Sequence, residues 1–583
     1  MLIADGEYQQ AAVHLLAGDP AGDPVAVATL RAAAAETLAE SAPEVAADLL
    51  RRALREPPVP AERPLVLKEL ALVEARIGDP GALGHFEEAF ATTSSLADMA
   101  DAAGRYATLL CGRGLEREAE AVIDRVIGTV DDRERRLLLE ADLCTLAAVT
   151  GDATARARLR QRLVRVASRL AGSTPAERLL LGLRADAPGL ENSVTELTGV
   201  VSAALGDGLL LAEQGPESPV FLFMVGALQS ADQLEQADRE LAAAVIEARR
   251  RGAGVGFAMA SGLLGISAQK RGRLLAAEAD ARAAVEVARE MGWLALFPYP
   301  LAWLIGVLND RGEFSEAERL LEADNLADTL PEGEAFTELL GARGALRLAQ
   351  GQRERARADL LEFGDRLARE ADPRPHNWVR LARSLAPVLA EDGREREAKE
   401  LAEEAVRVAV AFGQPRFIGT ALRARARAHA AGPDLVDLRR AVEAFEQIEA
   451  PIELAQTLVD VGAVLRRARQ PAAAREPLRR ALDIARACGA RPLAVRAEHE
   501  LRAAGARPRR DRVTGRDALT ASEHRIAQLA IEGMTNRQIA QALFITRKTV
   551  ETHLERVFRK LGIHSRGELE RALAEEETSA PVA

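Results

Sequence analysis

The sequence predicts an all-α protein in which a long solenoid of helical pairs is followed by a small domain of four helices. Three observations carry this prediction. Ala, Leu, Arg and Glu, which all favour helix, dominate a chain with only 3% aromatic residues. A pattern of a turn residue followed by spaced alanines recurs about every 40 residues. Near the C-terminus, four helix-start signals follow one another between residues 520 and 565.

The length and charge distribution indicate a multi-domain protein with one basic part. A chain of 583 residues is too long for a single core, and about three to five domain-sized units are expected. The net charge is −11, yet residues 506–573 hold 14 Lys/Arg and 8 Asp/Glu, a net charge of +6. The rest of the chain therefore carries −17. A small basic module attached to a large acidic body suggests a polyanionic partner for the module.

Several classes of protein are disfavoured by what the sequence lacks. The three cysteines, Cys111, Cys144 and Cys488, are too far apart to suggest a disulfide framework or a zinc site. The N-terminus shows no signal-peptide pattern, and the longest apolar run, 219–228, is about half the length of a membrane span. We therefore expect a cytoplasmic protein that makes no membrane contact.

The repeat begins with a turn residue, and small or apolar residues follow at five, nine and twelve positions further on. The copies start at Gly272, Gly312, Gly351 and Gly393, with weaker ones at Asp232, Gly432 and Arg469 and an isolated one at Gly114. Spacing of i, i+4 and i+7 places the small residues on one helical face, where a partner helix can approach closely. A period near 40 thus predicts stacked helical pairs, an α-solenoid that resembles tetratricopeptide (TPR) repeats but has a longer period.

These patterns predict a domain order. Residues 1–110 have a composition that favours helix and contain irregular repeats, and TPR-like repeats follow over 111–505. A basic linker, 506–517, leads to the four-helix domain, 518–574, and residues 575–583 are expected to be a disordered tail.

The aromatic residues of the central repeats allow two interpretations. The first is an effector pocket on the solenoid, formed by Trp293, Phe297, Tyr299, Trp303 and Trp378. The second is that these side chains fill gaps between alanine-rich helices, and we favour it because aromatic residues are mostly found in cores. Two prolines in the segment 293–303 should interrupt a helix.

No catalytic or cofactor-binding motif is present. A P-loop requires Gly-Lys-Ser/Thr, whereas none of the five lysines follows a glycine. The sequence contains no carboxylate pair in a catalytic motif and no metal-spaced cluster. We therefore expect neither an enzyme nor a bound cofactor.

The basic module contains four predicted helices, near 521–532, 536–543, 547–561 and 566–574. Capping boxes begin at Thr520, Thr535 and Ser565, and Thr546 provides a simple N-cap. Only three residues separate the second and third helices, which is the length of a helix-turn-helix connection. Val550, Leu554, Val557 and Leu561 form the expected buried stripe of the third helix, and its opposite face would enter the major groove of DNA.

Residues 519–569 resemble the LuxR/FixJ-type DNA-binding domain. The resemblance rests on Leu519-Thr520 with Glu523, on Thr535-Asn536-Arg537-Gln538-Ile539-Ala540, on Thr549-Val550 with His553-Leu554, and on Lys560-Leu561-Gly562 with Ser565-Arg566. It implies a four-helix helix-turn-helix domain that binds double-stranded DNA as a homodimer through its fourth helix.

The rest of the chain resembles the C-terminal portion of the large ATP-binding LuxR-type (LAL, MalT-like) regulators of actinobacteria. Residues 25–58 are similar to the helical segment that follows their ATPase domain. Because no ATPase motif is present, ATP-dependent switching is not carried over. Either the protein is a relative without the ATPase, or its true start lies upstream.

The expected contacts with DNA fall into two groups. Contacts to phosphates position the domain, and contacts to base edges give specificity. The predicted phosphate contacts are Thr535, Arg537, Arg547, Lys548, Thr549, Lys560, Ser565 and Arg566. The predicted base contacts are Glu551, Thr552 and Glu555, at positions where several relatives have Lys or Arg. Carboxylates accept from the cytosine amino group, and threonine meets the thymine methyl, so we expect C and T edges to be read.

A protein-interaction scaffold is the alternative function. In that interpretation the acidic solenoid binds another regulator, while the helix-turn-helix domain is degenerate or pairs only with similar domains. Glu551 and Glu555 and the missing ATPase support it. The surrounding basic and hydroxyl residues argue against it and favour a DNA-binding transcriptional regulator that carries a sensor or interaction solenoid.

Overall fold

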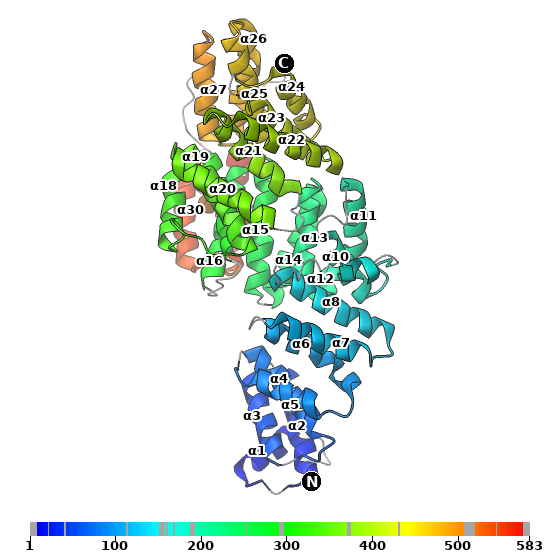
Figure 1. Ribbon diagram of the computed structural model, residues 1–583. Coiled ribbons are helices and arrows are strands. Elements are labelled where there is room, and N and C mark those ends of the chain that lie inside the picture. Colours follow the sequence, from blue (N-terminus) through cyan, green and yellow to red (C-terminus); the bar gives the residue numbers. More distant parts are fainter. Residues whose placement is uncertain are drawn as a thin grey trace. The chain divides into compact units, whose positions relative to one another are not determined.

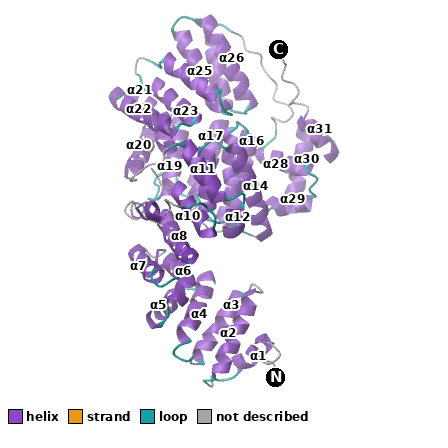
Figure 2. Ribbon diagram, turned by 90° about the vertical axis from the view of Figure 1, so that its right-hand side faces the viewer, coloured by secondary structure: helices purple, strands orange, loops and turns teal. Residues whose placement is uncertain are grey.

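In a computed structural model, helices are the regular elements of the described residues, and the chain forms two compact units, Met1–Ala187 and Pro188–Ala583 (Figure 1). The structure describes residues 8–574 apart from 21, 40–41, 57, 78, 112–114, 151–157, 159–160, 167–169, 187–192, 252, 291–296, 370–374, 430–431, 507–518 and 544. Within this part there is no strand (Figure 2) and no helix long and apolar enough to cross a membrane. The predicted basic linker and tail lie outside it, save for Ala506.

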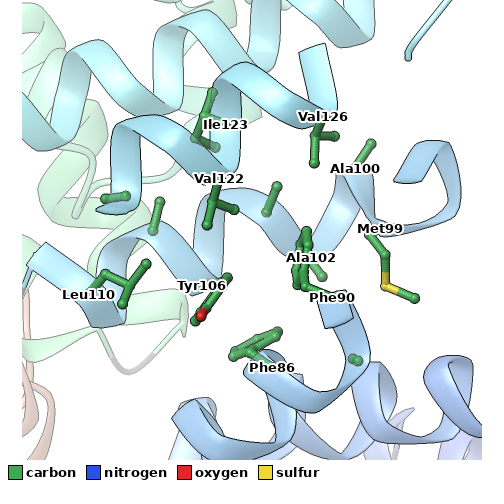
Figure 3. Close-up of a cluster of buried hydrophobic side chains, with 14 of the residues drawn as sticks. Phe86, Phe90, Met99, Ala100, Ala102, Tyr106, Leu110, Val122, Ile123 and Val126 are labelled. Carbon is green, nitrogen blue, oxygen red and sulfur yellow. The ribbon is translucent and has the colours of Figure 1, made fainter. Parts of the chain in front are cut away.

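The first unit consists of short helices that pack mainly on their chain neighbours. Its helices are α1 (Tyr8–Ala17), α2 (Pro24–Ala39), α3 (Pro43–Arg55), α4 (Arg63–Ile77), α5 (Ala82–Thr92), η1 (Leu96–Met99), α6 (Ala100–Cys111), α7 (Glu116–Ile127), α8 (Arg133–Thr150) and α10 (Pro175–Asp186). Tyr106 anchors one core, since its ring stacks at 5.4 Å on Phe86 and at 5.2 Å on Phe90 (Figure 3). Ala119, Ile123 and Val126, the small face predicted for the isolated repeat, complete that core and are fully buried.

The second unit contains the predicted solenoid of helical pairs. Two helices, α11 (Val194–Leu205) and α12 (Leu209–Gln214), precede it. The pairs are α13 (Pro219–Ser230) with α14 (Leu234–Arg251), α15 (Gly254–Lys270) with α16 (Leu274–Glu290), α17 (Pro298–Arg311) with α18 (Phe314–Ala323), α19 (Glu334–Ala349) with α20 (Arg353–Arg369), α21 (Pro375–Glu391) with α22 (Glu395–Phe412), α23 (Pro415–Arg427) with α24 (Leu435–Phe445), and α25 (Pro451–Arg467) with α26 (Pro471–Ala487), after which α27 (Arg491–Ala503) closes the series.

The repeat pattern is confirmed residue by residue. Each predicted turn residue from Asp232 to Arg469 lies between the two helices of a pair and has a positive φ, from 58° at Arg469 to 108° at Gly432. The small residues that follow are buried on the second helix, as Ala277, Ala281 and Ala284 show with no exposed surface. The prolines of the segment 293–303 occupy the first turn of α17 and do not interrupt a helix, because that turn needs no proline N–H.

The first helices of the pairs form an inner layer. Helices α13, α15, α17, α19 and α21 each contact the next one in the series, and α21 contacts α23. In the described part of the unit, consecutive second helices make no comparable contact with one another. Elements that touch their neighbours follow a tighter curve than elements that do not. The first helices therefore line the inner side of the solenoid, and the second helices its outer side.

The solenoid closes on itself after about 180 residues. The guanidinium of Arg416 reaches back from α23 to Asp232, with Nε and Oδ1 2.9 Å apart, across 184 residues of sequence. Its Nη1 also donates to Glu453 Oε1 at 2.6 Å, and its Nη2 donates to the carbonyl of Glu449 at 2.6 Å. Arg416 is almost fully buried. It therefore clamps the turn of one repeat to two later repeats.

Two glycine turns show the same closure. A Cβ at Gly272 would lie 2.7 Å from Pro451 Cγ and 2.5 Å from Cys488 Sγ, and a Cβ at Gly312 would lie 2.7 Å from Pro492 Cγ. Both turns have a positive φ as well, so the close approach and the backbone conformation each require glycine. The equivalent turn residue Asp232 also has a positive φ although it is not a glycine, and its carboxylate accepts from Arg416.

The clamp predicts a large loss of stability when Arg416 is removed. Arg416→Met leaves two carboxylates, Asp232 and Glu453, without their buried partner. The expected cost is about 3–5 kcal/mol of unfolding free energy, measured by urea denaturation. Arg396→Met is the control, because Arg396 lies on the outer helix α22 with 86% of its side chain exposed, and it should change stability by less than about 0.5 kcal/mol. Equal effects of the two substitutions would contradict the clamp.

Candidate nucleic-acid interface

The four predicted helices of the basic module are present and end where their signals predicted. They are α28 (Ala521–Ile531), α29 (Asn536–Leu543), α30 (Arg547–Leu561) and a last helix that starts as the 3-10 turn η3 (Arg566–Glu568) and continues as α31 (Leu569–Ala574). Gly533 and Gly562 follow α28 and α30 with φ of 85° and 68°. These left-handed residues stop each helix at the predicted place.

Two of the three predicted capping boxes form. Thr520 N donates to Glu523 Oε2 at 2.7 Å while its hydroxyl accepts from Glu523 N, and Thr535 and Gln538 make the same reciprocal pair. The Ser565 box was predicted wrongly. The Ser565 hydroxyl donates to the Glu568 carboxylate, and no side-chain cap of the backbone forms there. The reason is that the segment opens with a 3-10 turn, in which Glu568 N donates to the Ser565 carbonyl instead.

The core of the domain fixes which face of α30 is available for DNA. Val550, Leu554 and Val557 are buried against α28 and α29, together with Ile539. Leu561 packs at the edge of the same core. Figure 2 shows α28, α29, α30 and α31 grouped as one small bundle. The opposite face of α30, from Lys548 to Arg559, is left outward as predicted.

Two of the predicted phosphate contacts serve the domain's own structure. Lys560 Nζ lies 2.6 Å from Glu523 Oε2 and joins the end of α30 to the start of α28. Arg566 donates to the carbonyl oxygens of Ala530 and Met534 and to Asn536 Oδ1, and it ties η3 to the loop between α28 and α29. Neither side chain is fully exposed, so both position the helices that carry the outer cations.

Exposed cations gather on α29 and α30. Arg537 and Lys548 are exposed, as predicted for phosphate contacts, and so are Arg556 and Arg559, which the predicted set omitted. Among the described residues, none of the four has a carboxylate within 4.0 Å. The signal for Arg556 and Arg559 was available in the sequence, because both lie opposite the buried stripe. Arg547 is also exposed, but it pairs with Glu551 at 2.9 Å.

Of the three hydroxyl groups among the predicted phosphate contacts, that of Thr535 caps a helix, α29. Thr535 and Ser565 are exposed at the starts of α29 and η3, and Thr549 lies 2.7 Å from the Thr546 hydroxyl in the first turn of α30. The N-termini of α29 and α30 are thus capped by the hydroxyls of Thr535 and Thr546. The N-terminus of a helix favours a phosphate.

The three predicted base contacts differ in what they already bind. The Glu551 carboxylate accepts from Arg547, and the Thr552 hydroxyl donates to the Lys548 carbonyl at 3.0 Å. Glu555 is exposed and has no ion pair among the described residues. The two glutamates thus have different roles. Glu551 neutralises a neighbouring arginine, and Glu555 is the carboxylate that remains available as an acceptor.

Burial and charge set the protonation of two groups in the domain. Burial alone would raise the pKa of Glu523, but the bond from Lys560 and the Thr520 cap hold it below its ordinary value. Burial lowers the pKa of His553, which stands on α30 between the core and the outer face, against the opposing effect of Glu523. Glu523 is therefore charged and His553 neutral at neutral pH.

The outer surface of α28 contacts the solenoid at α16. Arg525 Nη2 lies 3.5 Å from Asp280 Oδ1. Burial raises the pKa of Asp280, and Arg525 favours its charged form. The cations of α29 and α30 remain exposed in this arrangement, so the contact leaves the candidate interface open.

The aromatic residues predicted for an effector pocket lie in different surroundings. Phe297 is buried in the core between α16 and α19, and Trp378 packs on a separate core formed by α19 to α22. Tyr299 and Trp303 stack on one another at 6.2 Å and are half-buried on α17. Trp293 lies outside the described residues. The structure thus brings together only Tyr299 and Trp303 of this set.

Comparison with known proteins agrees with the geometry of the four-helix bundle. Residues 517–573 match the family described as bacterial regulatory proteins, luxR family. These residues form a LuxR-family helix-turn-helix domain.

Three similar sequences match this chain over stretches of 50 to 58 residues. Rv0890c of Mycobacterium tuberculosis, named as an HTH-type transcriptional regulator, is 44% identical over 55 residues, which are 9% of this chain and 6% of the relative. The response regulatory protein YgeK of Escherichia coli is 45% identical over 58 residues, 10% of this chain and 40% of that protein. A nitrate/nitrite response regulator homolog of Haemophilus influenzae is 42% identical over 50 residues, 9% and 24%. The chain thus spans well under two thirds of these relatives.

Solved structures resemble the helical repeats weakly. The APC/C hetero-tetramer Cut9–Hcn1 aligns over 85% of this chain and 94% of that chain with a TM-score of 0.48 and 13% identity. A Rap protein complexed with Competence and Sporulation Factor aligns over 67% and 99% with a TM-score of 0.38 and 10% identity.

The pairing of Glu523 in the LuxR-family domain gives a pH-dependent prediction. Its pKa is below 4.5 in the folded protein, so the pairing stabilises the domain above that pH and is lost as the pH falls through the folded pKa. Glu523→Gln should lower the opening free energy of α28 and α30 amides by about 1–3 kcal/mol at pH 7, measured by hydrogen exchange on the full chain. The difference from the native protein should shrink in acid. Glu532→Gln, at an exposed position after α28, should show no loss, and a similar loss there would refute the assignment.

Proposed function

We propose that this protein is a DNA-binding transcriptional regulator of the cytoplasm, in which the LuxR-family domain binds double-stranded DNA and the solenoid senses an effector or a partner. The observation that carries the proposal is the exposed cation set on α29 and α30, namely Arg537, Lys548, Arg556 and Arg559. A basic face beside two helix N-termini suits a phosphate backbone. No comparable set is needed by a domain that only pairs with other proteins.

In this proposal, the basic residues of α29 and α30 contact phosphates, and the acceptor residues of α30 contact base edges. Arg537 and Lys548 would contact phosphates, with Thr535, Thr549 and Ser565 at helix starts beside them. Glu555 and Thr552 would meet base edges in the major groove, where a carboxylate accepts from the cytosine amino group. Glu551 would then reach a base only by releasing Arg547, and we assign it to holding that arginine.

Homodimerisation through the fourth helix is part of the proposal. The resemblance implies it, and α31 offers an outward surface with Glu570 exposed beside residues that complete the domain core. Two domains related by a two-fold axis would meet two half-sites on one side of the duplex. We also propose kinship with the MalT-like class. A Walker motif in the reading frame upstream of this sequence would support it.

The dependence of DNA binding on salt tests the proposal. The full chain is titrated with a duplex of arbitrary sequence at several salt concentrations. Each phosphate contact contributes to the slope of log affinity against log salt, so Arg537→Gln and Lys548→Gln should each reduce it by about one. Arg396→Gln, on the outer side of the solenoid, is the matched control and should leave the slope unchanged. An absence of binding at low salt would contradict the proposal and favour the scaffold.

The same salt titration can be made with a substitution that removes a negative charge instead of a positive one. Glu551→Gln removes an anion from the face of α30 and releases Arg547 from its ion pair. Non-specific affinity should therefore rise, and the slope should steepen by about one. Glu532→Gln removes the same charge from a position away from α30 and should change neither quantity.

A further inference from the structure

Helix α28 of the LuxR-family domain is covered on two sides. Its core side carries Ile526, Ala527 and Ala530, which are buried in the core that α28 shares with α30. The opposite side carries Arg525 and Gln528, one turn apart, and both are half-buried instead of exposed. Among the described elements outside the domain, the one that α28 contacts extensively is α16 of the solenoid. The second side of α28 is therefore a contact surface for the solenoid.

Helix α16 has a matching surface on its outward side. Ala277 and Ala281 face the solenoid core, and Ala279 lies on the opposite side of the helix, yet only 7% of it is exposed. The outward side of a second helix is otherwise open to solvent, as Arg396 and Glu400 on α22 show with 86% and 63% of their side chains exposed. Of the described elements that contact α16 extensively, α28 is the one that is not a neighbouring repeat helix. We therefore assign the cover of Ala279 to α28.

An ion pair crosses this contact. Arg525 Nη2 lies 3.5 Å from Asp280 Oδ1, and 29% and 10% of the two side chains are exposed. Burial raises the pKa of Asp280, and Arg525 is the cation that most favours its charged form, ahead of Arg273 and Arg249. A partly exposed ion pair contributes modestly to an interface, so this contact can form and break.

The chain between the two helices allows the contact to be reversible. Helix α27 ends at Ala503 and α28 begins at Ala521. The residues between them, 504–520, can span at most about 60 Å. A short tether keeps each domain at a high effective concentration near the other, so a weak contact is still populated. Docking of α28 on α16 therefore needs no tight interface.

Docking holds a basic module against an acidic body. Residues 506–573 carry a net charge of +6, and the rest of the chain carries −17. The cations of α29 and α30 stay exposed when α28 contacts α16, so the solenoid does not cover the candidate interface. Docking instead changes the electrostatic potential around these cations, because a negatively charged body held beside them repels a DNA duplex.

We propose that the contact of α28 with α16, held by Arg525 and Asp280, is an autoinhibitory latch that lowers the affinity of the LuxR-family domain for DNA. In the docked state the acidic solenoid opposes the DNA phosphates. In the released state the domain moves away from the solenoid on residues 504–520. DNA binding and docking then disfavour one another, and each weakens the other by the same factor. The inference rests on the proposed DNA-binding function.

Hydrogen exchange on the full chain, without DNA, tests the docking itself. Arg525→Gln, in the LuxR-family domain, should speed exchange in α16 by about threefold or more, and Asp280→Asn, in the solenoid, should speed exchange in α28 to a similar extent. Each variant reports through the domain that it does not alter, so a local loss of structure does not imitate the result. If neither helix responds to the substitution in the other domain, the latch is overturned.

The sign of the change in DNA affinity tests the inhibition. With a duplex of arbitrary sequence at low salt, Arg525→Gln should raise affinity by about threefold, although it removes a positive charge from the LuxR-family domain. Asp280→Asn should do the same. The two together should give no more than either alone, because both release the same contact. Glu400→Gln removes the same charge from the outer side of α22 and is the control, with no change expected.

The outcomes separate the latch from the proposed function. A lower affinity in Arg525→Gln, with no change in Asp280→Asn, would make Arg525 a phosphate contact and overturn the latch. Faster exchange with an unchanged affinity would show docking without inhibition and would overturn it as well. Both results leave the DNA-binding function standing. If the native protein and both variants bind no DNA, the proposed function fails and the latch fails with it.

Discussion

The buried guanidinium of Arg416 sets the geometry of the second unit. A stack of helical pairs specifies only how each pair lies on the next, and small rotations between pairs leave its curvature open. By binding Asp232 and Glu453 together, Arg416 joins repeats that are 184 residues apart and fixes how many pairs complete one turn. The turns at Gly272 and Gly312 lie against later repeats in the same way.

Features encoded within about ten neighbouring residues were predictable from the sequence. The turn residues, the buried small faces and the starts and ends of α28, α29 and α30 all follow from local spacing, capping and left-handed glycines. Asp232 could be recognised as a turn residue, but not as the acceptor of a distant arginine. Asp232 binds Arg416 only because the later repeat comes to lie against it when the solenoid completes one superhelical turn. No local sequence pattern contains that information.

The candidate site shows the same limit on a smaller scale. The sequence identified the outward face of α30 because the buried stripe defines it. It could not show that Lys560 and Arg566 bind groups inside the domain, because their partners, Glu523 and the carbonyl of Ala530, both lie on another helix, α28. The predicted effector pocket combined Phe297, which is buried in one core, and Trp378, which is half-buried against another, with Tyr299 and Trp303 on α17. The sequence shows where the aromatic residues are, but whether each one is buried in a core or lies nearer the surface is known only from the fold.

The acidic residues of α30 are compatible with a DNA-binding face once their partners are known. Glu551 is balanced by Arg547 within one turn, so the helix surface is less negative than its sequence suggests. Among the residues that the structure describes, Glu555 remains an unpaired acceptor beside exposed cations, and those cations offset its repulsion from phosphates. On this account the domain gains affinity from its arginines and lysines, and it gains selectivity from a carboxylate that accepts hydrogen bonds and donates none.

Selection of binding sites from a random DNA library by the full chain tests this account most directly. It predicts enriched half-sites in two-fold symmetric pairs, with a cytosine at the position that Glu555 meets and a thymine beside it. Enrichment of guanine at that position would contradict the assignment of Glu555, and no enrichment of any sequence would contradict the claim that α30 reads DNA.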